Sequence, residues 1–388
     1  MKEPCRCTVC GGTAATPFLR IEDVPVSCNH VCTNYDAAVA APRAAICLSF
    51  CVDCGHVFNS EYDSDDVDYQ PGYESSLRGS ELFREYDDTL VESLVERYDL
   101  RRRVIIEIGC GRGEFLQALC ERGGNCGIGF DPSYSGREKK ANPIPSIIIH
   151  RKTYGPQNNH PSADFICSRH TLEHIREPRR FLSNIRSAAT RPGVPVFFEL
   201  PNGLYILRDG GIWDIIYEHC SYFTPASLVR VFCEAGYEPV EVAETFGGQF
   251  LTLHARTGSS KREQATSVSA DLHSLVKHFA DSYESKLKEW TLRLGKLQSE
   301  GRKIVVWGAG AKAATFLNLL QPSAIDYVVD VNPRKQGNYV IGTGQRIVPP
   351  EFLRESVANE IICMNPNYMT EIAFQVRGLG VDANILSA

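Results

Sequence analysis

The chain has 388 residues, of which 43% are hydrophobic and 23% charged, and it carries a formal net charge of −6. This length predicts two or three domains with sizeable cores, and the negative charge and the lack of a long Lys/Arg run argue against a nucleic-acid-binding protein. No secretory signal pattern opens the sequence, and no apolar run is long enough to cross a bilayer. We therefore expect a cytoplasmic protein with neither nucleic-acid nor membrane partners.

Two Cys-x-x-Cys-Gly units, Cys7–Gly11 and Cys51–Gly55, stand near the start of the chain. Each unit can turn backbone amides toward two thiolates, and together they offer the four sulfurs typical of a closed structural zinc site. We expect such a Zn²⁺ site in a lobe of residues 1–68, which needs the metal in order to fold. The expected ligands are Cys7, Cys10, Cys51 and Cys54. Cys5 is an alternative to Cys7, and a redox Cys-x-x-Cys is the less favoured interpretation.

An aromatic and hydroxyl-rich stretch, residues 69–76, precedes a pattern of apolar residues at helical spacing. This pattern predicts a helix over residues 81–97. Tyr73, in the lid-like stretch before that helix, is a candidate ligand contact, although such a stretch taken alone is typical of a surface turn.

The apolar run Val104–Ile108 predicts a buried strand that leads through a tight turn into a helix. The turn contains three glycines at alternate positions, Gly109, Gly111 and Gly113. Glu107 stands near the end of the strand, and Asp131 ends the next apolar run, where it can accept hydrogen bonds from ribose hydroxyls. This pattern resembles the S-adenosylmethionine site of class I methyltransferases. A dinucleotide site, which usually spaces its glycines as G-x-G-x-x-G, and a turn without ligand are the competing interpretations.

Residues 163–167 predict the next strand, and polar residues follow it. Because ligands of doubly wound sheets lie at the carboxyl ends of the strands, we expect Ser168 and His170 to face the methyl donor. For His174, a catalytic or substrate-contacting role and a structural hydrogen bond are equally favoured. The match of residues 170–174 to a reversed zinc-protease motif is rejected, because the context is a strand end in a cofactor-binding sheet.

A further strand, residues 194–202, leads to a loop that carries Tyr217, Glu218 and His219. A phenol, a carboxylate and an imidazole side by side are suited to proton abstraction, so we expect His219 to act as the base with Glu218 orienting it. Thr224 and Pro225 predict a helix start just after this loop.

Two other residues near this loop are candidate substrate contacts. Tyr222 is one of them, although packing also explains it. Strands over residues 239–243 and 250–255 are expected to flank a Gly-Gly turn, and Gln249 in this turn is the other candidate.

Residues 261–300 have apolar residues at helical intervals and predict one long amphipathic helix or two shorter ones, in a monomer or a homodimer. Residues 301–388 begin with a second strand–glycine turn–helix unit, which taken alone indicates NAD. That interpretation is less favoured, because Ala313 replaces the third glycine. Lys312 at the helix N-terminus could instead receive a phosphate, and Lys335 and Asn367 on later loops could bind a polar ligand.

The order of these three parts resembles the sugar C-methyltransferases, which methylate the ring carbon beside a keto group of a nucleotide-linked deoxysugar. The resemblance spans nearly the whole chain. It is carried by Glu218–His219, Ser221–Phe223, Gly247–Gly248, Gly308–Lys312, Val328–Asp330, Lys335–Tyr339, Gly342–Thr343 and Asn367–Ile372.

The resemblance implies an α/β chain with a class I methyltransferase Rossmann-like core, an N-terminal zinc-binding lobe and a small C-terminal Rossmann-like domain. The corresponding boundaries are 1–68 for the zinc lobe, 69–260 for the S-adenosylmethionine-dependent methyltransferase domain, 261–300 for a helical linker and 301–388 for the substrate-binding domain.

The family also implies roles for individual residues. His219 and a neighbouring tyrosine act on the proton of the carbon to be methylated, His174 matches the family's histidine after the fourth core strand, and Tyr73 falls in its lid. The C-terminal domain helps to hold the nucleotide sugar, without NAD. The family commonly has Tyr-x-Glu-His, whereas here Tyr217 directly precedes Glu218, so the role of Tyr217 stays open.

The expected reaction is removal of a proton beside the ketone to give an enolate, followed by attack on the sulfonium methyl. Three alternatives remain: an O- or N-methyltransferase of a secondary metabolite, an NAD-dependent oxidoreductase that uses the C-terminal glycine loop, and a zinc-scaffolded binding protein.

Overall fold

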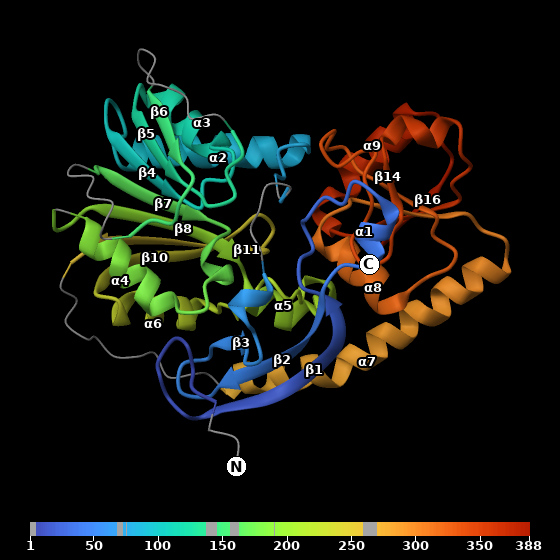
Figure 1. Cartoon of the computed structure of the whole chain (residues 1–388), viewed down its shortest axis with the longest axis horizontal. Coiled ribbons are helices and arrows are strands. Elements are labelled where there is room, and N and C mark those ends of the chain that lie inside the picture. Colours follow the sequence, from blue (N-terminus) through green and yellow to red (C-terminus); the bar gives the residue numbers. More distant parts are fainter. Residues whose placement is uncertain are drawn as a thin grey trace.

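The computed structural model describes residues 5–67, 73–74, 76–136, 146–155, 163–189, 191–258 and 270–388. These residues form three sheets of four, seven and five strands. Figure 1 shows the seven-stranded sheet on the left, the five-stranded sheet on the right and the four-stranded sheet below them. Of the lid-like stretch predicted to contact a ligand, residues 69–72 and 75 lie outside the described residues.

The four-stranded sheet has the order β1-β2-β3-β9. Its strands are β1 (Ala15–Pro25), β2 (Arg43–Cys51), β3 (Val57–Asn59) and β9 (Ser221–Tyr222), and α1 (Tyr35–Val39) joins β1 to β2. The strand β9 follows directly on the loop that carries His219, and it pairs with β3 in antiparallel fashion. The N-terminal part is therefore hydrogen-bonded to the loop expected to hold the base.

The seven-stranded sheet has the order β10-β11-β8-β7-β4-β5-β6. Its strands are β4 (Val104–Ile108), β5 (Cys126–Phe130), β6 (Ile147–His150), β7 (Phe165–Arg169), β8 (Pro195–Pro201), β10 (Tyr237–Thr245) and β11 (Phe250–Thr257). The strands β6, β5, β4, β7 and β8 run parallel, whereas β11 runs antiparallel to both of its neighbours. This is the Rossmann-like arrangement of a class I methyltransferase core, so the expected fold class is confirmed.

Helices cover both faces of this sheet. Successive strand residues point to opposite faces, so neighbouring apolar residues pack in two different clusters. Ile105 and Phe165 pack with α2 (Glu81–Arg97) and α3 (Glu114–Gly123) in one apolar cluster. Ile106 and Ile166 pack with α4 (Pro178–Ala188) and α6 (Pro225–Glu234) in another. The helix predicted over residues 81–97 is thus present with the same bounds.

Side-chain caps fix the start of two of these helices, of which only the one at Thr224 was predicted. The Ser80 side chain accepts a hydrogen bond from the Phe83 backbone at the start of α2. Thr224 and Ser227 form a capping box at the start of α6, with Pro225 at the first helical position. The loop that carries His219 therefore ends at a fixed point.

The five-stranded sheet near the C-terminus is parallel throughout, with the order β14-β13-β12-β15-β16. Its strands are β12 (Ile304–Trp307), β13 (Tyr327–Val329), β14 (Arg346–Val348), β15 (Glu360–Cys363) and β16 (Asn384–Ser387). Its helices are α8 (Ala311–Leu320) and α9 (Met369–Gly378). The remaining helices of the described chain are α5 (Gly203–Asp209), α7 (Ala270–Ser299) and short 3-10 turns at Ser64–Asp66, Leu172–His174, Ile212–Asp214, Pro350–Arg354 and Pro366–Tyr368.

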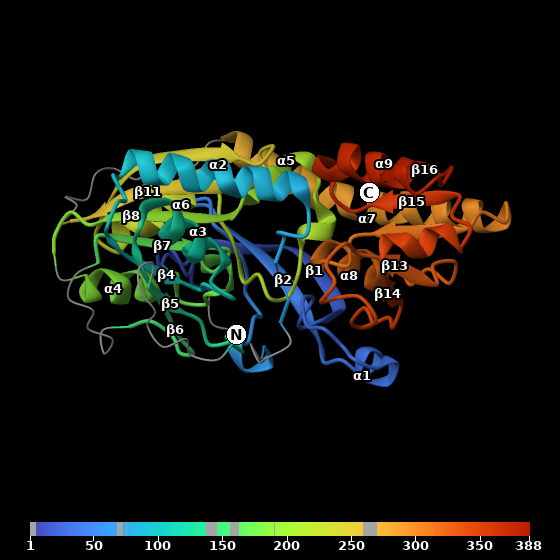
Figure 2. The ribbon, with the colours of Figure 1, turned by 90° about the horizontal axis from the view of Figure 1, so that it is seen from above.

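The three parts share one apolar core. The helix α7 is a single helix, the longer of the two expected alternatives, and it runs beneath β1 and α8 (Figure 1). Phe279 and Trp290 of α7 are buried in one cluster with Ile46 of β2, Trp213 and Phe316 of α8. Figure 2 shows α2 reaching from the seven-stranded sheet toward the five-stranded one. The relative positions of the parts are therefore set by packing.

Within the part of the chain that the structure describes, no helix combines the length and the apolar character that crossing a membrane requires.

Candidate active site

A cavity of about 900 Å³ lies where the three parts meet. Its wall includes Asn29 of the N-terminal part, Gly109 and His170 at the carboxyl ends of the central strands, and Trp307 and Lys312 of the C-terminal part. This volume is near the upper end for small-molecule sites, so the cavity has room for more than one ligand of moderate size.

The glycine loop after β4 forms one end of the cavity. All three of its glycines have positive φ, from +52° to +77°. A Cβ atom on Gly109 would lie 1.9 Å from the Thr171 Oγ1 atom, so only glycine fits there. Gly109 and Gly111 line the cavity, whereas Gly113 caps α3 and is not on the wall.

Two carboxyl groups face the same end of the cavity. Asp131 accepts a hydrogen bond of 2.7 Å from the Gly111 amide, and its other oxygen accepts from Ser133. Glu107 is 3% exposed, and its Oε2 atom has no hydrogen-bond partner among the described residues. Burial raises the pKa of Glu107 to about 8. A buried carboxyl oxygen without a partner fits a ligand that brings hydroxyl groups, such as a ribose.

Ser168 does not occupy its expected place. Its hydroxyl group is buried and donates to the Ile108 carbonyl oxygen at 2.8 Å, which ties β7 to β4. The side chain is therefore absent from the described cavity wall, where we expected it to contact the cofactor. His170 does lie on the wall, with a φ of +47° and its Nε2 atom 3.2 Å from Glu199 Oε1.

His174 and His219 lie together on the wall. Their ring centroids are 4.8 Å apart at an interplanar angle of 80°. Burial lowers the pKa of His174 to about 4, and burial together with His174 and His170 holds the pKa of His219 well below its ordinary value. Both rings are therefore neutral at pH 7, and a neutral imidazole can accept a proton.

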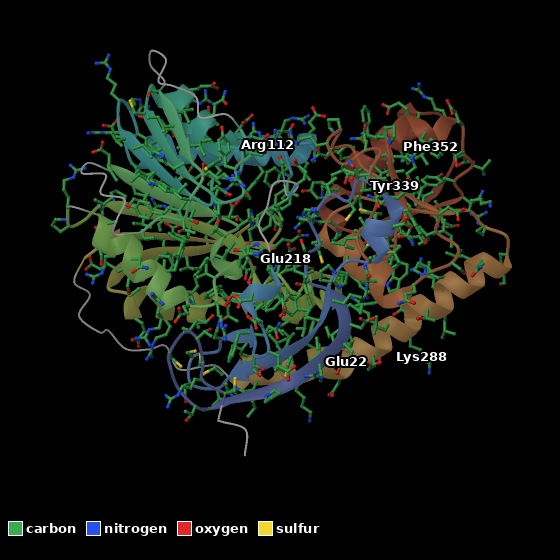
Figure 3. All side chains as sticks on the ribbon, viewed as in Figure 1. Glu22, Arg112, Glu218, Lys288, Tyr339 and Phe352 are labelled. Atoms are coloured by element: carbon green, nitrogen blue, oxygen red, sulfur yellow. The ribbon has the colours of Figure 1, made fainter. Side chains whose placement is uncertain are left out.

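Glu218 does not orient His219 through its carboxylate, contrary to expectation. Its two carboxyl oxygens accept from the Ser27 hydroxyl group at 2.9 Å and from the Cys28 amide at 3.0 Å. Its backbone carbonyl oxygen lies 3.0 Å from His174 Nδ1 instead. Figure 3 places Glu218 near the centre of the molecule, where the three parts meet. Glu218 thus fixes the loop against the N-terminal part and positions His174.

The tyrosines beside His219 point away from the cavity, which corrects the expected roles of Tyr217 and Tyr222. The Tyr217 hydroxyl donates to Asp66 at 2.6 Å and accepts from the Asp63 amide, outside the cavity wall. The Tyr222 hydroxyl is held by both backbone groups of Ile216. Tyr73 is the expected tyrosine that does lie on the wall, at 3.4 Å from the Asn29 side chain.

The far wall belongs to the C-terminal part. Lys312 lies 2.9 Å from Asp214, and Lys335 donates to the Ala309 carbonyl oxygen at 3.0 Å. Gln249 and Asn365 exchange two hydrogen bonds of 2.7 and 2.8 Å between their side-chain amides. Asn367 is not on the wall as expected, because its side chain donates to the Phe246 carbonyl oxygen and joins the C-terminal part to the β10–β11 turn.

A buried charge network that the sequence did not suggest lies behind His170. Arg169 contacts Asp87 at 2.5 Å and Glu199 at 2.7 Å, and the Tyr86 hydroxyl also donates to Glu199. The position of Arg169 at the end of a strand could have indicated that it belongs to the site. The sequence around Asp87 gives no such indication, since Asp87 stands within a helix among other polar residues.

The four expected cysteine sulfurs come together beside the N-terminal sheet. The Sγ atoms of Cys7 and Cys54 are 3.6 Å apart, as are those of Cys10 and Cys51, and all four lie within 4.8 Å of one another. A tetrahedral zinc ion with Zn–S bonds of about 2.3 Å separates its sulfurs by roughly 3.8 Å, so this arrangement fits such an ion. Cys5 is outside this group.

Two family models and one curated relative match the chain. Residues 79–242 match the model of a methyltransferase domain, and residues 247–381 match that of a C-methyltransferase C-terminal domain. The chain is 24% identical to the C-methyltransferase NovU of Streptomyces niveus over 301 residues, which cover 73% of this chain and 71% of NovU.

Among solved structures, magnesium protoporphyrin IX methyltransferase of Synechocystis PCC 6803 is 18% identical over 46% of this chain and 84% of its own, with a TM-score of 0.35. A SAM-dependent methyltransferase of Aquifex aeolicus is 16% identical over 43% of this chain and 89% of its own, with a TM-score of 0.33. Scores this low add nothing about function.

The family models and the site together define the protein as an S-adenosylmethionine-dependent methyltransferase. More narrowly, it is a relative of the C-methyltransferases, as the C-terminal model and the likeness to NovU show.

Proposed function

We propose that the protein methylates the carbon beside a keto group of a nucleotide-linked deoxysugar, with His219 as the base. The observation that carries this proposal is the place of His219. Its half-buried imidazole shares one cavity with the glycine loop after β4 and with the lysines of the C-terminal part.

The methyl donor is assigned to the glycine-loop end of the cavity. Glu107 and Asp131 are the acceptors for its ribose hydroxyls, and the backbone at Gly109 and Gly111 lets it approach closely. S-adenosylmethionine supplies, when bound there, an electrophilic methyl group. His170 lines the same cavity.

The acceptor is assigned to the side of the C-terminal part. Lys312 and Lys335 offer ammonium donors to a diphosphate, and Gln249 lines the same cavity. The Lys312 ammonium group contacts Asp214, and that of Lys335 donates to the Ala309 carbonyl oxygen. An ammonium group has three donor hydrogens, so each can also donate to a ligand. A keto-sugar attached to such a diphosphate would extend toward His219.

The proposed chemistry needs a base that is unprotonated at neutral pH. The depressed pKa of His219 meets this condition. His219 removes a proton from the carbon beside the ketone, which leaves an enolate whose carbon carries the electron pair. His174, held by the Glu218 carbonyl oxygen, packs against the His219 ring and restricts its orientation.

Zinc is proposed as the ion of the four-cysteine group, with a structural role. The four thiolates would complete its coordination, so no position would remain for a substrate. We assign the zinc lobe to residues 1–68, the methyltransferase domain to 69–260, the helical linker to 261–300 and the substrate-binding domain to 301–388.

The proposal is tested with S-adenosylmethionine that carries a ¹³C-labelled methyl group and a panel of nucleoside-diphosphate-linked keto-deoxysugars. We expect one sugar of the panel to gain a ¹³C-methyl group, and NMR of the product to show that methyl group bonded to carbon. A methyl group bonded to oxygen or nitrogen would contradict the proposal and favour an O- or N-methyltransferase on the same scaffold.

A further inference from the structure

The carboxyl group of Glu173 is the least explained polar group on the cavity wall. Glu173 is 2% exposed, and neither of its carboxyl oxygens has a hydrogen-bond partner among the described residues. Its backbone is fixed, because the Cys220 thiol donates to the Glu173 carbonyl oxygen at 3.3 Å. A buried carboxyl group without a partner is costly unless a ligand or a second charge completes it.

The surroundings of Glu173 are rich in imidazole. Ligand atoms of Glu173, His174 and His219 lie within 4.8 Å of one another, and His170 Nδ1 lies 3.8 Å from Glu173 Oε1. On the neighbouring strand β8, Glu199 is the like charge that acts on Glu173. Burial is the main reason why the pKa of Glu173 rises to about 7, with Glu199 adding to it and His170 opposing it.

The reaction proposed above keeps the net charge of the reacting groups at one positive unit from beginning to end, since the second cation that proton transfer creates is offset by the enolate. Before transfer the charge lies on the sulfonium sulfur. The C–H bond then breaks, its proton goes to His219 and its electron pair stays on carbon. As the C–C bond forms, the C–S bond breaks and its electron pair goes to sulfur. The positive charge has then moved from sulfur to the imidazolium of His219, and either cation is costly in a low-dielectric site without a nearby anion.

We propose that Glu173 is the anion that balances both cations, first the sulfonium of the bound methyl donor and then the imidazolium of His219. This inference rests on the proposed function. Glu173 acts through its charge and does not itself take part in bond formation, so it is a positioning residue. Its carboxyl group releases its proton to the solvent when the cationic donor binds, and it stays ionised through methyl transfer.

The test is calorimetry of the purified protein with S-adenosylmethionine and with S-adenosylhomocysteine, at pH 7 in buffers of different ionisation enthalpy. The two compounds differ by the methyl group and its positive charge. A group with a pKa of about 7 is half protonated at pH 7, so the cationic compound should release up to about half a proton more than the neutral one. Effects of ribose or amino-acid contacts cancel in the comparison.

Three variants locate the proton. Glu173→Gln is expected to bind both compounds and to lose the difference in proton release. Glu177→Gln removes the same charge from an exposed side chain and is expected to keep the difference. His219→Asn is also expected to keep the difference in proton release, and this variant still tests the inference if Glu173→Gln does not fold.

The inference is overturned if wild-type protein releases equal numbers of protons with both compounds, if the difference persists in Glu173→Gln, or if it disappears in His219→Asn. Native mass spectrometry that finds a second metal ion, lost in Glu173→Gln, would overturn it as well, since Glu173 would then be a metal ligand. No binding of either compound would contradict the proposed function, and this inference with it.

Discussion

At the scale of single residues, the proposal depends most on His219. Replacement by asparagine keeps the approximate size of the side chain and removes the basic nitrogen. We expect His219→Asn to lower kcat by on the order of 10²-fold or more, with unchanged affinity for S-adenosylmethionine in calorimetry. A variant that kept the wild-type rate on the methylated sugar would remove His219 from its role as the base.

Glu107 leads to a prediction about pH. Burial raises its pKa in the folded protein from 4.5 to about 8. Between these values the folded state binds the proton and the unfolded state does not, so stability falls as the pH rises. Between pH 6.5 and pH 8 we expect the titration of Glu107 to lower the free energy of unfolding of the ligand-free protein by on the order of 1 to 2 kcal/mol.

Glu107→Gln should reduce this loss. The measurement is chemical denaturation of both proteins across that pH range, without added ligand. Glu173 and Glu218 act in the same direction, each with a pKa raised to about 7 by burial, so a smaller slope remains in the variant. Identical slopes for the two proteins would show that Glu107 titrates normally.

The candidate residues show which parts of the site could be predicted from the sequence. Glu107, Gly109, Gly111 and Asp131 do lie on the cavity wall, where a strand, a turn and a helix place them by local geometry, and their contact with a cofactor stays a prediction. Tyr217, Glu218 and Tyr222 could not be placed in this way, since a loop without periodicity leaves the direction of each side chain open. Asp66, the partner of Tyr217, and Cys28, a partner of Glu218, both lie more than 150 residues away in the sequence.

At the scale of structural elements, the two cysteine knuckles carry the clearest prediction. The N-terminal sheet packs apolar residues such as Ile46 into the core that it shares with the rest of the chain, and we propose that metal binding adds to the stability of this part. We expect Cys51→Ser to lower the zinc content and the midpoint of thermal unfolding, whereas Cys5→Ser keeps both near wild type. Metal analysis of the purified proteins checks the first point and calorimetric melting the second.

Loss of zinc from Cys5→Ser but not from Cys51→Ser would show that the ligand set is wrong. Chelation of the metal from the wild-type protein should reproduce the effect of Cys51→Ser, because both leave thiolates without their ion.

Elements with a strong local pattern were predictable, and their junctions were not. The helix Glu81–Arg97, the cap at Thr224 and the β10–β11 turn follow from spacing and turn chemistry. The spacing of His170 and His174 could place both on one face of a helix, but the structure has a 3-10 turn at Leu172–His174 instead. A strand end that enters an active site is shaped by long-range contacts, here with Glu199 and Glu218.

At the scale of the whole molecule, the cavity depends on how the three parts meet. Glu74 shows the kind of contact involved, because it precedes α2 and pairs with Arg334 of the C-terminal part at 2.6 Å. Arg112 of the glycine loop, labelled in Figure 3, lies 4.0 Å from the carboxyl group of Glu74. Sequence could predict the order of the parts, whereas the shared cavity emerges from packing across all of them.

The most direct test of this arrangement is a crystal structure of the protein with S-adenosylhomocysteine and a nucleoside diphosphate together. We predict that the adenosyl ribose lies against Glu107 and Asp131, that the diphosphate lies near Lys312 and Lys335, and that the sulfur atom points toward His219. Binding of the adenosyl compound anywhere else, or a sulfur atom that faces away from His219, would contradict the central claim.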